Sequence, residues 1–239
     1  VIGEGGDCWA SAETVIRMCE MVGIRTRYGA TEQVSIFSGG HLFPVCIIDG
    51  KYATVEANLG CGVVSEDAGV FKADRNYRID TYDYPYMTGM VEGGIVLSTY
   101  IGFGGNEVIP SEINGDKVVE IGALCFSLGV TYLEDSKLTG VSIPNTVKRI
   151  GNSAFYGCKD IKNLYIPKSV ETIGMAAFIG CSSLNLQLDR DNPYFYADNA
   201  QGILYSKDMQ TIIVAFNLKT SDFAIPAGVK YIGDGAFYG

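Results

Sequence analysis

Residues 143–155 read IPNTVKRIGNSAF, and residues 166–178 read IPKSVETIGMAAF. The two stretches share Ile-Pro at the start, Val in the middle, Ile-Gly after it, and Ala-Phe at the end. They lie 23 residues apart, whether measured from Pro144 to Pro167 or from Phe155 to Phe178. A repeat of this length with fixed apolar positions predicts a solenoid, in which each turn buries its apolar face against its neighbours.

Two further copies of the same frame flank this pair. They are Ile109-Pro110, Val118, Ile121-Gly122 and Cys125-Phe126, and then Ile225-Pro226, Val229, Ile232-Gly233 and Ala236-Phe237. We expect equivalent isoleucines and phenylalanines to stack, because each large side chain contributes roughly 1.5–3 kcal/mol when it is fully buried. The glycine of each copy is expected at a tight corner. Cys158 and Cys181 each follow a repeat phenylalanine by three positions and are expected to stack as small buried residues.

The interval before the last copy is longer than the others, which predicts an insertion around residues 185–220. Residues 192–216 alternate between apolar and polar side chains, which predicts a small hairpin sheet on the solenoid. Its aromatic run, Tyr194-Phe195-Tyr196, has two interpretations: packing against the sheet, or a binding patch.

The repeat frame resembles the BspA-like leucine-rich repeats of bacterial surface proteins over residues 94–239. The resemblance implies a leucine-rich-repeat β-solenoid, which we assign to residues 91–239. It also implies a secreted or cell-surface protein whose repeats serve in adhesion or in binding a host or bacterial surface protein. Residues 89–94, which include three glycines, are expected to form a short linker before this domain.

The segment from Asp7 to Gly23 has the pattern of one amphipathic helix. Its apolar positions recur at steps of three and four residues, at Ala12, Val15, Cys19 and Val22. Gly23 is a typical helix end, and Asp7 is a good N-cap. Cys8 then lies in the first turn, where unpaired N–H groups and the helix dipole favour a thiolate.

Two strand-like runs meet at Asp49-Gly50, which is a strong signal for a two-residue β-hairpin. In such a hairpin the numbers of opposed residues add up to 99. Phe43 then faces Glu56, and His41 lies diagonal to Glu56 on the same face of the sheet. A thiolate, an imidazole and a carboxylate are the groups that nucleophilic catalysis combines.

Asp7-Cys8-Trp9-Ala10 at a helix start, His41 at a strand start and Glu56 near the end of the next strand resemble the transglutaminase-like core of papain-type cysteine enzymes. The resemblance covers about the first 90 residues and implies an α+β papain/transglutaminase-like domain over residues 1–90. It implies Cys8 as the nucleophile, His41 as the general acid and base, and Glu56 as the residue that orients His41.

This resemblance leaves several questions open. Trp9 either lines a substrate groove or anchors the helix in the core. The substrate would be a protein or peptide, and hydrolysis and transfer to an amine share the same acyl-enzyme. The alternative function is a catalytically inert adhesin or protein-binding module that uses the repeats, because Glu56 stands where this family usually has Asp.

Composition excludes several classes of partner. The net charge of −9 and the pI of about 4.6 disfavour nucleic acid and anionic membranes, since both need a basic surface. No apolar run approaches the ~20 residues that cross a bilayer. Seven cysteines without CxxC spacing and a single histidine argue against a zinc site and against a disulfide framework, and no cofactor is expected. The chain begins with Val1, which suggests a piece of a longer protein with a truncated first domain.

Overall fold

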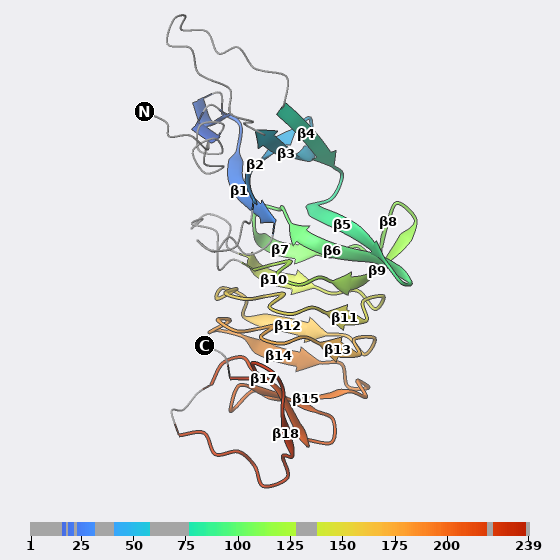
Figure 1. Ribbon diagram of the computed structural model, residues 1–239, viewed down its shortest axis with the longest axis vertical. Coiled ribbons are helices and arrows are strands. Elements are labelled where there is room, and N and C mark those ends of the chain that lie inside the picture. The colour runs from blue at the N-terminus through green and yellow to red at the C-terminus, as the bar shows by residue number, and fades with distance from the viewer. Residues whose placement is uncertain are drawn as a thin grey trace, which may run out of the picture. The chain divides into compact units, whose positions relative to one another are not determined.

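The computed structural model describes residues 16–17, 19–21, 23–31, 41–57, 77–127, 138–218 and 222–237 (Figure 1). The chain divides into two compact units. The first comprises Val1–Pro85 with Val130–Leu133, and the second comprises Tyr86–Gly129 with Glu134–Gly239.

The strands are β1 (Thr26–Thr31), β2 (His41–Ile48), β3 (Lys51–Ala57), β4 (Tyr77–Tyr82), β5 (Tyr86–Val91), β6 (Gly94–Tyr100), β7 (Gly105–Val108), β8 (Glu112–Ile113), β9 (Asp116–Ile121), β10 (Leu138–Ser142), β11 (Arg149–Ile150), β12 (Asn163–Ile166), β13 (Thr172–Ile173), β14 (Asn185–Leu188), β15 (Phe195–Asp198), β16 (Ile203–Ser206), β17 (Thr211–Ala215) and β18 (Tyr231–Ile232).

A helical segment precedes β1 in the first unit and ends where the sequence predicts. Residues 16–17 and 19–21 are helical, and Gly23 has a positive φ of 77°. The Ile24 N–H donates to the Cys19 carbonyl (2.9 Å), and the Gly23 N–H donates to the Glu20 carbonyl (3.0 Å). These two bonds form a Schellman motif, in which glycine is favoured because it has no Cβ. The predicted helix end is confirmed, whereas the predicted start at Asp7 and Cys8 lies outside the described residues.

The sheet of the first unit is antiparallel, with strand order β1-β2-β3-β4. Asp49 and Gly50 both have positive φ, 50° and 77°, as a type I′ hairpin turn requires. The β2–β3 ladder pairs Val45 with Thr54 and continues to the pair Ile48–Lys51. This is the register predicted from the sequence, and it is confirmed.

The described part of the first unit does not show a papain-like domain. It consists of the helical segment and the four-stranded sheet, with a small core of Cys46, Ala53 and Val55. The α+β prediction for residues 1–90 therefore stays a prediction.

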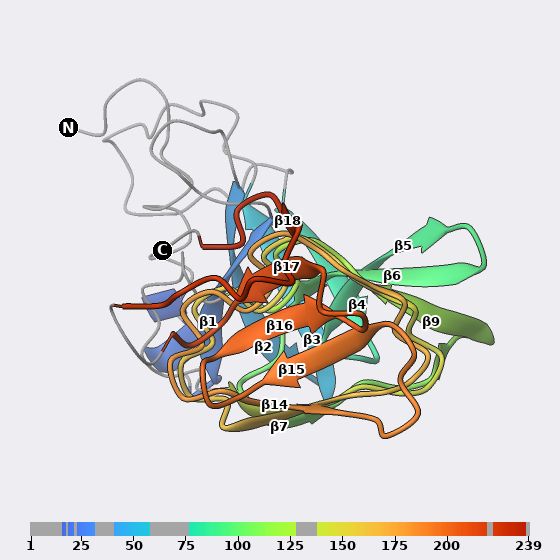
Figure 2. The ribbon, with the colours of Figure 1, turned by 90° about the horizontal axis from the view of Figure 1, so that it is seen from below.

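The second compact unit, which we call the repeat unit, is the predicted β-solenoid, with parallel strands in two sheets. One sheet has the order β14-β12-β10-β7, and the other has the order β13-β11-β9-β6-β5. Equivalent strands of successive turns pair in parallel, and β5 is an antiparallel strand at the edge. Figure 2 looks along the stack, where the successive turns superpose.

The glycine of the repeat frame lies where two turns of the solenoid touch. The Gly151 N–H donates to the Ile121 carbonyl (2.7 Å), and the Gly174 N–H donates to the Ile150 carbonyl (2.8 Å). A Cβ on Gly151 would lie 2.5 Å from the backbone nitrogen of Ala123. The glycine is therefore required because the backbones of two turns touch at this position. The sequence predicts a tight corner here but not this contact.

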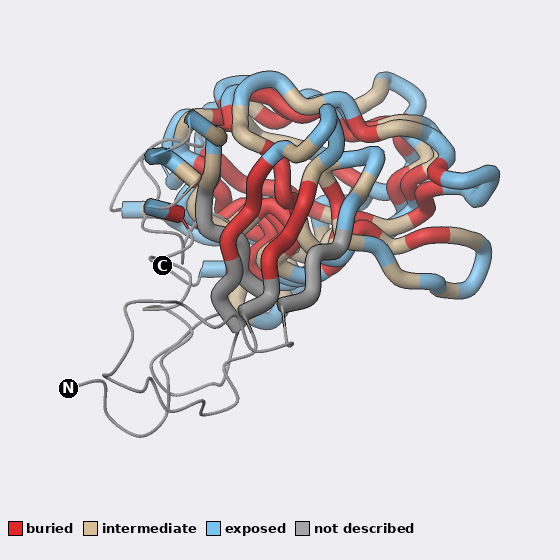
Figure 3. Tube along the Cα trace, turned by 90° about the horizontal axis from the view of Figure 1, so that it is seen from above, coloured by how far each residue is buried: buried red, intermediate tan, exposed pale blue. Residues whose placement is uncertain are grey.

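The phenylalanines of three repeat copies form the predicted stack. Phe126 and Phe155 are stacked with ring centroids 5.1 Å apart, and Phe155 and Phe178 follow at 5.7 Å. Tyr86 and Tyr100 continue this aromatic cluster beside Phe126. Figure 3 shows the buried positions gathered on the inside of the repeat unit.

The fourth copy departs from this stacking prediction. Phe237 is 38% exposed and packs against Phe223. The reason is the insertion: β18 of this copy pairs with β17 of the inserted sheet. Phe237 therefore has a side chain of the inserted segment as its ring neighbour, and the prediction is wrong for this copy.

The repeat cysteines are buried and structural, as predicted. The Cys158 thiol donates to the Phe126 carbonyl (3.0 Å), and the Cys181 thiol donates to the Phe155 carbonyl (3.1 Å). Burial raises the pKa of Cys181 to about 12. Both thiols are free of disulfides and lie one above the other in successive turns.

The insertion forms the predicted hairpin sheet, in which β15, β16 and β17 pair antiparallel. Two asparagine side chains hold it to the repeats. The Asn199 amide accepts from the Leu186 N–H (2.8 Å) and donates to the Leu186 carbonyl (2.9 Å), so it imitates a neighbouring strand. The buried Asn192 donates to the Pro167 carbonyl (3.2 Å) and accepts from the Phe195 N–H (3.1 Å).

The predicted linker at residues 89–94 is wrong. These residues belong to the β5–β6 hairpin, with Glu92 and Gly93 at its turn. A Cβ on Gly94 would collide with the backbone carbonyl of Lys117 in β9. Glycine is present here because two strands approach closely, which a composition pattern does not distinguish from a flexible connection.

Candidate functional site

The predicted catalytic residues lie in the first unit, and the structure describes only part of their surroundings. Cys8 and Trp9 are outside the described residues. His41 begins β2, where its backbone pairs with Thr31, and Glu56 lies in β3. The side chains of His41 and Glu56 are outside the described part, so the catalytic set stays a prediction.

Two other cysteines of the first unit have the environment of structural thiols. Cys46 is buried in β2, and Cys19 is half-buried in the helical segment. Burial raises the pKa of Cys46, and the nearby Cys19 raises it further. Burial and then the Glu20 carboxylate raise the pKa of Cys19. Both thiols are therefore protonated at neutral pH and are poor nucleophiles.

The repeat unit presents a candidate binding surface on the outward side of the sheet β14-β12-β10-β7. We call it the amide face and define it by two rows of side chains that cross the strands in register. The first row is Val108, Ser142, Tyr165 and Gln187, and the second is Asn106, Gly140, Asn163 and Asn185. Every side chain in these rows is uncharged.

The asparagine row is partly linked by its own amides. The Asn163 side-chain oxygen accepts from the Asn185 amide (3.2 Å) and from the Gln187 amide (3.4 Å). Asn106 lies over Gly140, because a Cβ on Gly140 would collide with the Asn106 side-chain oxygen. The in-register strands are spaced by about 4.8 Å. The row carries amides on β7, β12 and β14, whereas Gly140 on β10 carries none.

Tyr165 is the aromatic residue of the amide face. Its side chain is 45% exposed, and its hydroxyl donates to the Asp189 carboxylate (2.6 Å). This bond lowers the pKa of Asp189, with a second contribution from the Asp191 N–H, and it raises the pKa of Tyr165. The hydroxyl is thereby anchored while the ring stays in solvent.

The sequence carries a signal for the amide face in the alternation of its strands. Leu164 and Ile166 are buried, so the alternation of β12 directs Asn163 and Tyr165 outward. The apolar frame shared by the repeats does not reveal this surface, because its residues point inward. The outward positions between the frame residues carry the chemistry of this surface.

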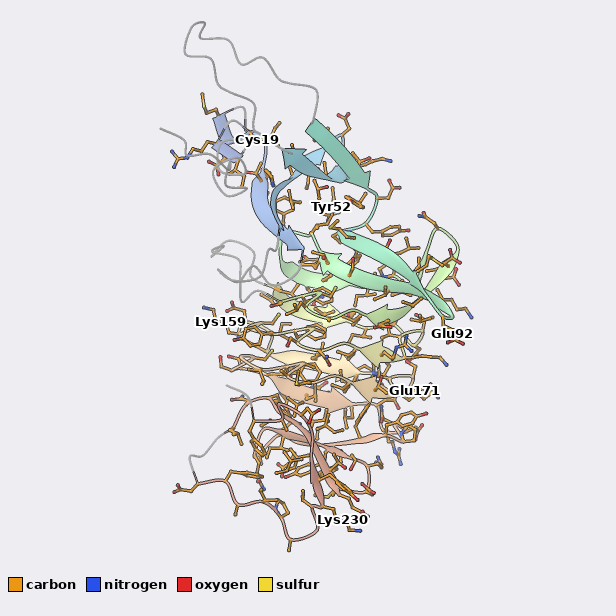
Figure 4. The ribbon with its side chains drawn as sticks, in the orientation of Figure 1. Cys19, Tyr52, Glu92, Lys159, Glu171 and Lys230 are labelled. Carbon is orange, nitrogen blue, oxygen red and sulfur yellow. The ribbon has the colours of Figure 1, made fainter. Side chains whose placement is uncertain are left out.

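The other sheet carries charges on its outward side, which we call the ion-pair face. Arg149 on β11 donates to the Glu120 carboxylate of β9 through Nε (2.9 Å) and Nη2 (2.6 Å). Lys148 pairs with Glu171 at 3.4 Å. The bond to Glu120 raises the pKa of Arg149, and Glu92 and Glu171 add smaller contributions. Figure 4 shows Glu92 and Glu171 on the same side of the repeat unit and Lys159 on the opposite side.

Within the described ranges no three His, Cys, Asp or Glu side chains are grouped as ligands for a metal ion. No helix in the part of the chain that the structure describes is long and apolar enough to span a membrane.

Three solved structures resemble the chain. A leucine-rich repeat protein of T. pallidum is 29% identical with a TM-score of 0.42, and the match covers 64% of each chain. A leucine-rich cell surface protein of Faecalibacterium prausnitzii is 26% identical with a TM-score of 0.46, over 65% of this chain and 51% of that one. A leucine-rich repeat protein of Eubacterium ventriosum is 20% identical with a TM-score of 0.37, over 62% and 59%. The chain thus spans between about half and two thirds of the length of these proteins.

The comparison with curated proteins found no match. The scan against protein families matched the BspA type leucine rich repeat region over residues 120–239, in six copies. This is two copies more than the four predicted from the repeat frame. The matched residues form the core of the solenoid and its inserted sheet. The chain therefore belongs to the family of proteins with BspA-type leucine-rich repeats.

Proposed function

We propose that this chain is part of a secreted or cell-surface protein and acts as an adhesin or protein-binding module. The binding part would be residues 91–239, with the amide face as its contact surface. The observation that carries the proposal is the exposure of Tyr165 (45%) and Val108 (64%) in one in-register row. Tyrosine is enriched among the residues that dominate binding energy at interfaces.

Family membership supports the same proposal. A stack of repeats produces an extended, rigid surface whose outward residues are free to vary while the apolar frame is kept. The pairing of Val108 with Ser142, and of Ser142 with Tyr165, spans strands from three successive turns. A partner bound there would contact a surface that already has its bound shape, which lowers the entropic cost of association.

The test is saturable binding of the fluorescently labelled full chain to intact bacterial and epithelial cells, measured by flow cytometry. A double variant, Val108→Ser with Tyr165→Ala, should weaken half-saturation at least about tenfold, equivalent to ~1.4 kcal/mol. The matched control is Arg149→Ala on the ion-pair face, which should bind like the parent chain. Binding that is absent, or that both variants change equally, would contradict the proposal.

A second candidate function is thiol-dependent acyl transfer by residues 1–90. Two observations support it: the hairpin at Asp49-Gly50 has the register that the catalytic hypothesis requires, and the helical segment ends at Gly23 as that hypothesis expects. Cys8 would attack a peptide or glutamine carbonyl and form a thioester. His41 would protonate the departing amine and then activate water or a second amine, with Glu56 orienting its ring.

Labelling with iodoacetamide at neutral pH tests this second function. The described cysteines of the repeat unit are buried, and burial raises the pKa of Cys125 and Cys181, so their background labelling should be slow. Peptide mass mapping should find one fast adduct, at Cys8, that Cys8→Ser abolishes and His41→Ala slows at least about tenfold. An unlabelled Cys8, or a rate that His41→Ala leaves unchanged, would count against catalysis. If labelling succeeds, incorporation of a labelled amine into a glutamine peptide separates amine transfer from hydrolysis.

A further inference from the structure

We propose that the ligand of the amide face is a neutral, extended β-1,4-linked polysaccharide that lies across the strands, along the two rows. The proposal rests on the proposed binding function and specifies the chemical class of its ligand. Three features of the face carry it: the absence of charge in its rows, the presence of a hydrogen-bonding side chain on each of its four strands, and the position of Tyr165.

The charge of the face selects against ionic ligands. The two rows contain amides, a hydroxyl, a phenol, a valine and a glycine, whereas the chain as a whole has a net charge of −9. An acidic polymer would be repelled by the chain and would find no cation in these rows. A basic polymer would find no carboxylate in them, and the Asp189 carboxylate beside Tyr165 already accepts the hydrogen bond of its hydroxyl. A neutral ligand rich in hydroxyl groups is compatible with both facts.

The hydrogen-bonding groups of the face recur at a spacing that an extended glycan can follow. Asn106, Asn163 and Asn185 lie on three strands, and Ser142 and Gln187 lie on the row beside them. The four strands extend over about 14 Å at ~4.8 Å per step. Sugar units of an extended β-linked chain recur at a comparable interval. A side-chain amide has N–H donors and an oxygen acceptor, and because the Asn163 oxygen already accepts from two neighbours, Asn163 offers its N–H donors to a sugar hydroxyl.

The internal bonds of the asparagine row leave capacity for a ligand. The Asn163 oxygen accepts from two neighbouring amides, while its own amide nitrogen donates to no partner among the described residues. Asn163, Asn185 and Gln187 are therefore linked before a ligand arrives, and the exposed Asn163 still has N–H donors to offer. Such pre-organisation reduces the ordering cost of binding.

Tyr165 supplies the aromatic surface that sugar recognition uses. Its hydroxyl is tied to Asp189 at 2.6 Å, so the ring cannot rotate freely, and 45% of the side chain remains in solvent. The face of an aromatic ring is electronegative and attracts the C–H groups on the flat side of a sugar. Asn163, on the same strand, lies on the same side of the sheet as Tyr165 because the two are separated by one residue.

Of the two forms of the proposed function, an adhesin with a glycan ligand fits these rows better than a module that binds a protein. A stable protein interface buries about 800 Å² on each partner around an apolar centre. The amide face has only Val108 and Tyr165 as large apolar side chains, and Ser142 lies between them in the row. The hydroxyl and amide content of the rows favours a glycan.

Isothermal titration calorimetry of the full chain with cellohexaose and with chitohexaose tests the proposal, with a hyaluronan hexasaccharide as the anionic control. At least one neutral hexasaccharide should bind saturably, and the hyaluronan fragment should not. Tyr165→Ala and Asn163→Asp should each weaken binding at least about tenfold, while Arg149→Ala should leave it unchanged. Tyr165→Phe keeps the ring and should lose less than about threefold, since a single exposed hydrogen bond contributes little.

The thermal midpoint of each variant is measured in parallel, so that a loss of binding is counted only for variants that melt with the parent chain. Asn163→Asp serves if Tyr165→Ala is destabilised, because it keeps the shape of the side chain. No saturable heat with either neutral hexasaccharide overturns the proposal, as does binding that Asn163→Asp and Tyr165→Ala leave intact. If cell binding depends on the amide face but neither sugar binds, the ligand class is wrong while the proposed function stands.

Discussion

The amide face and the ion-pair face come from the same turns of the solenoid and enclose the same interior. On both sheets, parallel strands place equivalent positions in rows, as in the pairs Ser142–Tyr165 and Glu120–Arg149. The rows differ in what they do with their polar groups. Arg149 and Glu120 satisfy each other across neighbouring strands, whereas the Asn163 amide nitrogen donates to no partner among the described residues.

This difference indicates that the repeat frame does not determine which residue types occupy the outward positions. The inward positions are constrained by close packing and by glycine contacts between turns. The outward positions on one sheet neutralise each other, and those on the other sheet form an uncharged, aromatic surface. The binding role that we propose concerns one face only. The predictions below test that asymmetry, beginning with the interior that both faces share.

Removal of a stacked ring should damage both faces at once. Phe155 is fully buried between Phe126 and Phe178, and Phe155→Ala should lower the free energy of unfolding by about 3–5 kcal/mol through lost burial and a cavity. Urea denaturation followed by circular dichroism measures the change. Phe237→Ala is the matched control, because that ring is partly exposed, and it should cost less than half as much. Equal losses of unfolding free energy in the two variants would show that the phenylalanine stack does not stabilise the two faces.

Substitutions at two glycines distinguish a backbone contact between turns from a contact with a side chain. Gly151→Ala places a methyl group 2.5 Å from the backbone nitrogen of Ala123 and should destabilise by about 1–3 kcal/mol. Gly140→Ala meets only the side-chain oxygen of Asn106, which can rotate away, so its cost should be smaller. Thermal denaturation of both variants measures this difference. A larger loss for Gly140→Ala would contradict the assignment of Gly151 to the contact between turns.

The edge of the amide face should depend on Asn199. Asn199→Ala removes both hydrogen bonds to the Leu186 backbone and should cost about 1–3 kcal/mol, because the partly buried polar groups lose their partner. Hydrogen exchange of the Leu186 amide should accelerate in this variant. Asn163→Ala, an exposed amide of the same face, is the control and should change exchange at Leu186 little. An unchanged exchange rate of the Leu186 amide in Asn199→Ala would contradict the role of Asn199 in stabilising this edge.

The ion pair should matter less to stability than its short distances suggest. Arg149 is solvent-exposed and Glu120 is half-buried. Ion pairs at the surface contribute roughly 0–1 kcal/mol to the free energy of unfolding. Arg149→Ala should therefore lower the unfolding free energy by less than about 1 kcal/mol, and added salt should reduce the difference further. Chemical denaturation at low and high salt provides the measurement. A loss above that range would indicate that the ion-pair face supports the fold.

The smallest effect concerns pH and the Tyr165–Asp189 bond. The pKa of Asp189 is lowered in the folded chain, so this carboxylate contributes stability above its unfolded pKa and loses it as pH falls through the folded value. The pKa of Tyr165 is raised, so its contribution is present below its unfolded pKa and is lost as pH rises through the folded value. Tyr165→Phe should thus lower the melting temperature slightly at neutral pH and not in strong acid. A difference between variant and parent that is independent of pH would contradict this account.

Much of the fold could be predicted from particular local signals. Gly23 and Asp49-Gly50 have the positive φ values that their sequence contexts require, and the hairpin register followed from its turn length. The repeat frame predicted the solenoid, the stacked phenylalanines and the buried Cys158 and Cys181, because period and side-chain volume are properties of the sequence itself.

Other features depended on contacts between distant segments. The glycines of residues 89–94 indicated a linker, but Gly94 is required by Lys117, which is far away in sequence. Phe237 has the right place in the repeat frame, yet the insertion supplies its neighbour. The catalytic set of Cys8, His41 and Glu56 stays a prediction, since proximity of three distant side chains is a tertiary property.

The sequence by itself determined that this chain repeats, where it turns and which side chains stack, because these follow from spacing, chirality and burial. Only the tertiary structure decided which outward residues become neighbours. Val108, Ser142, Tyr165 and Gln187 belong to four strands and form a row only when parallel pairing sets the register. Neighbours on the outer surface of a solenoid lie on different strands and are far apart in the sequence. The hydrogen bonds between turns set the register and so decide which of these residues are neighbours.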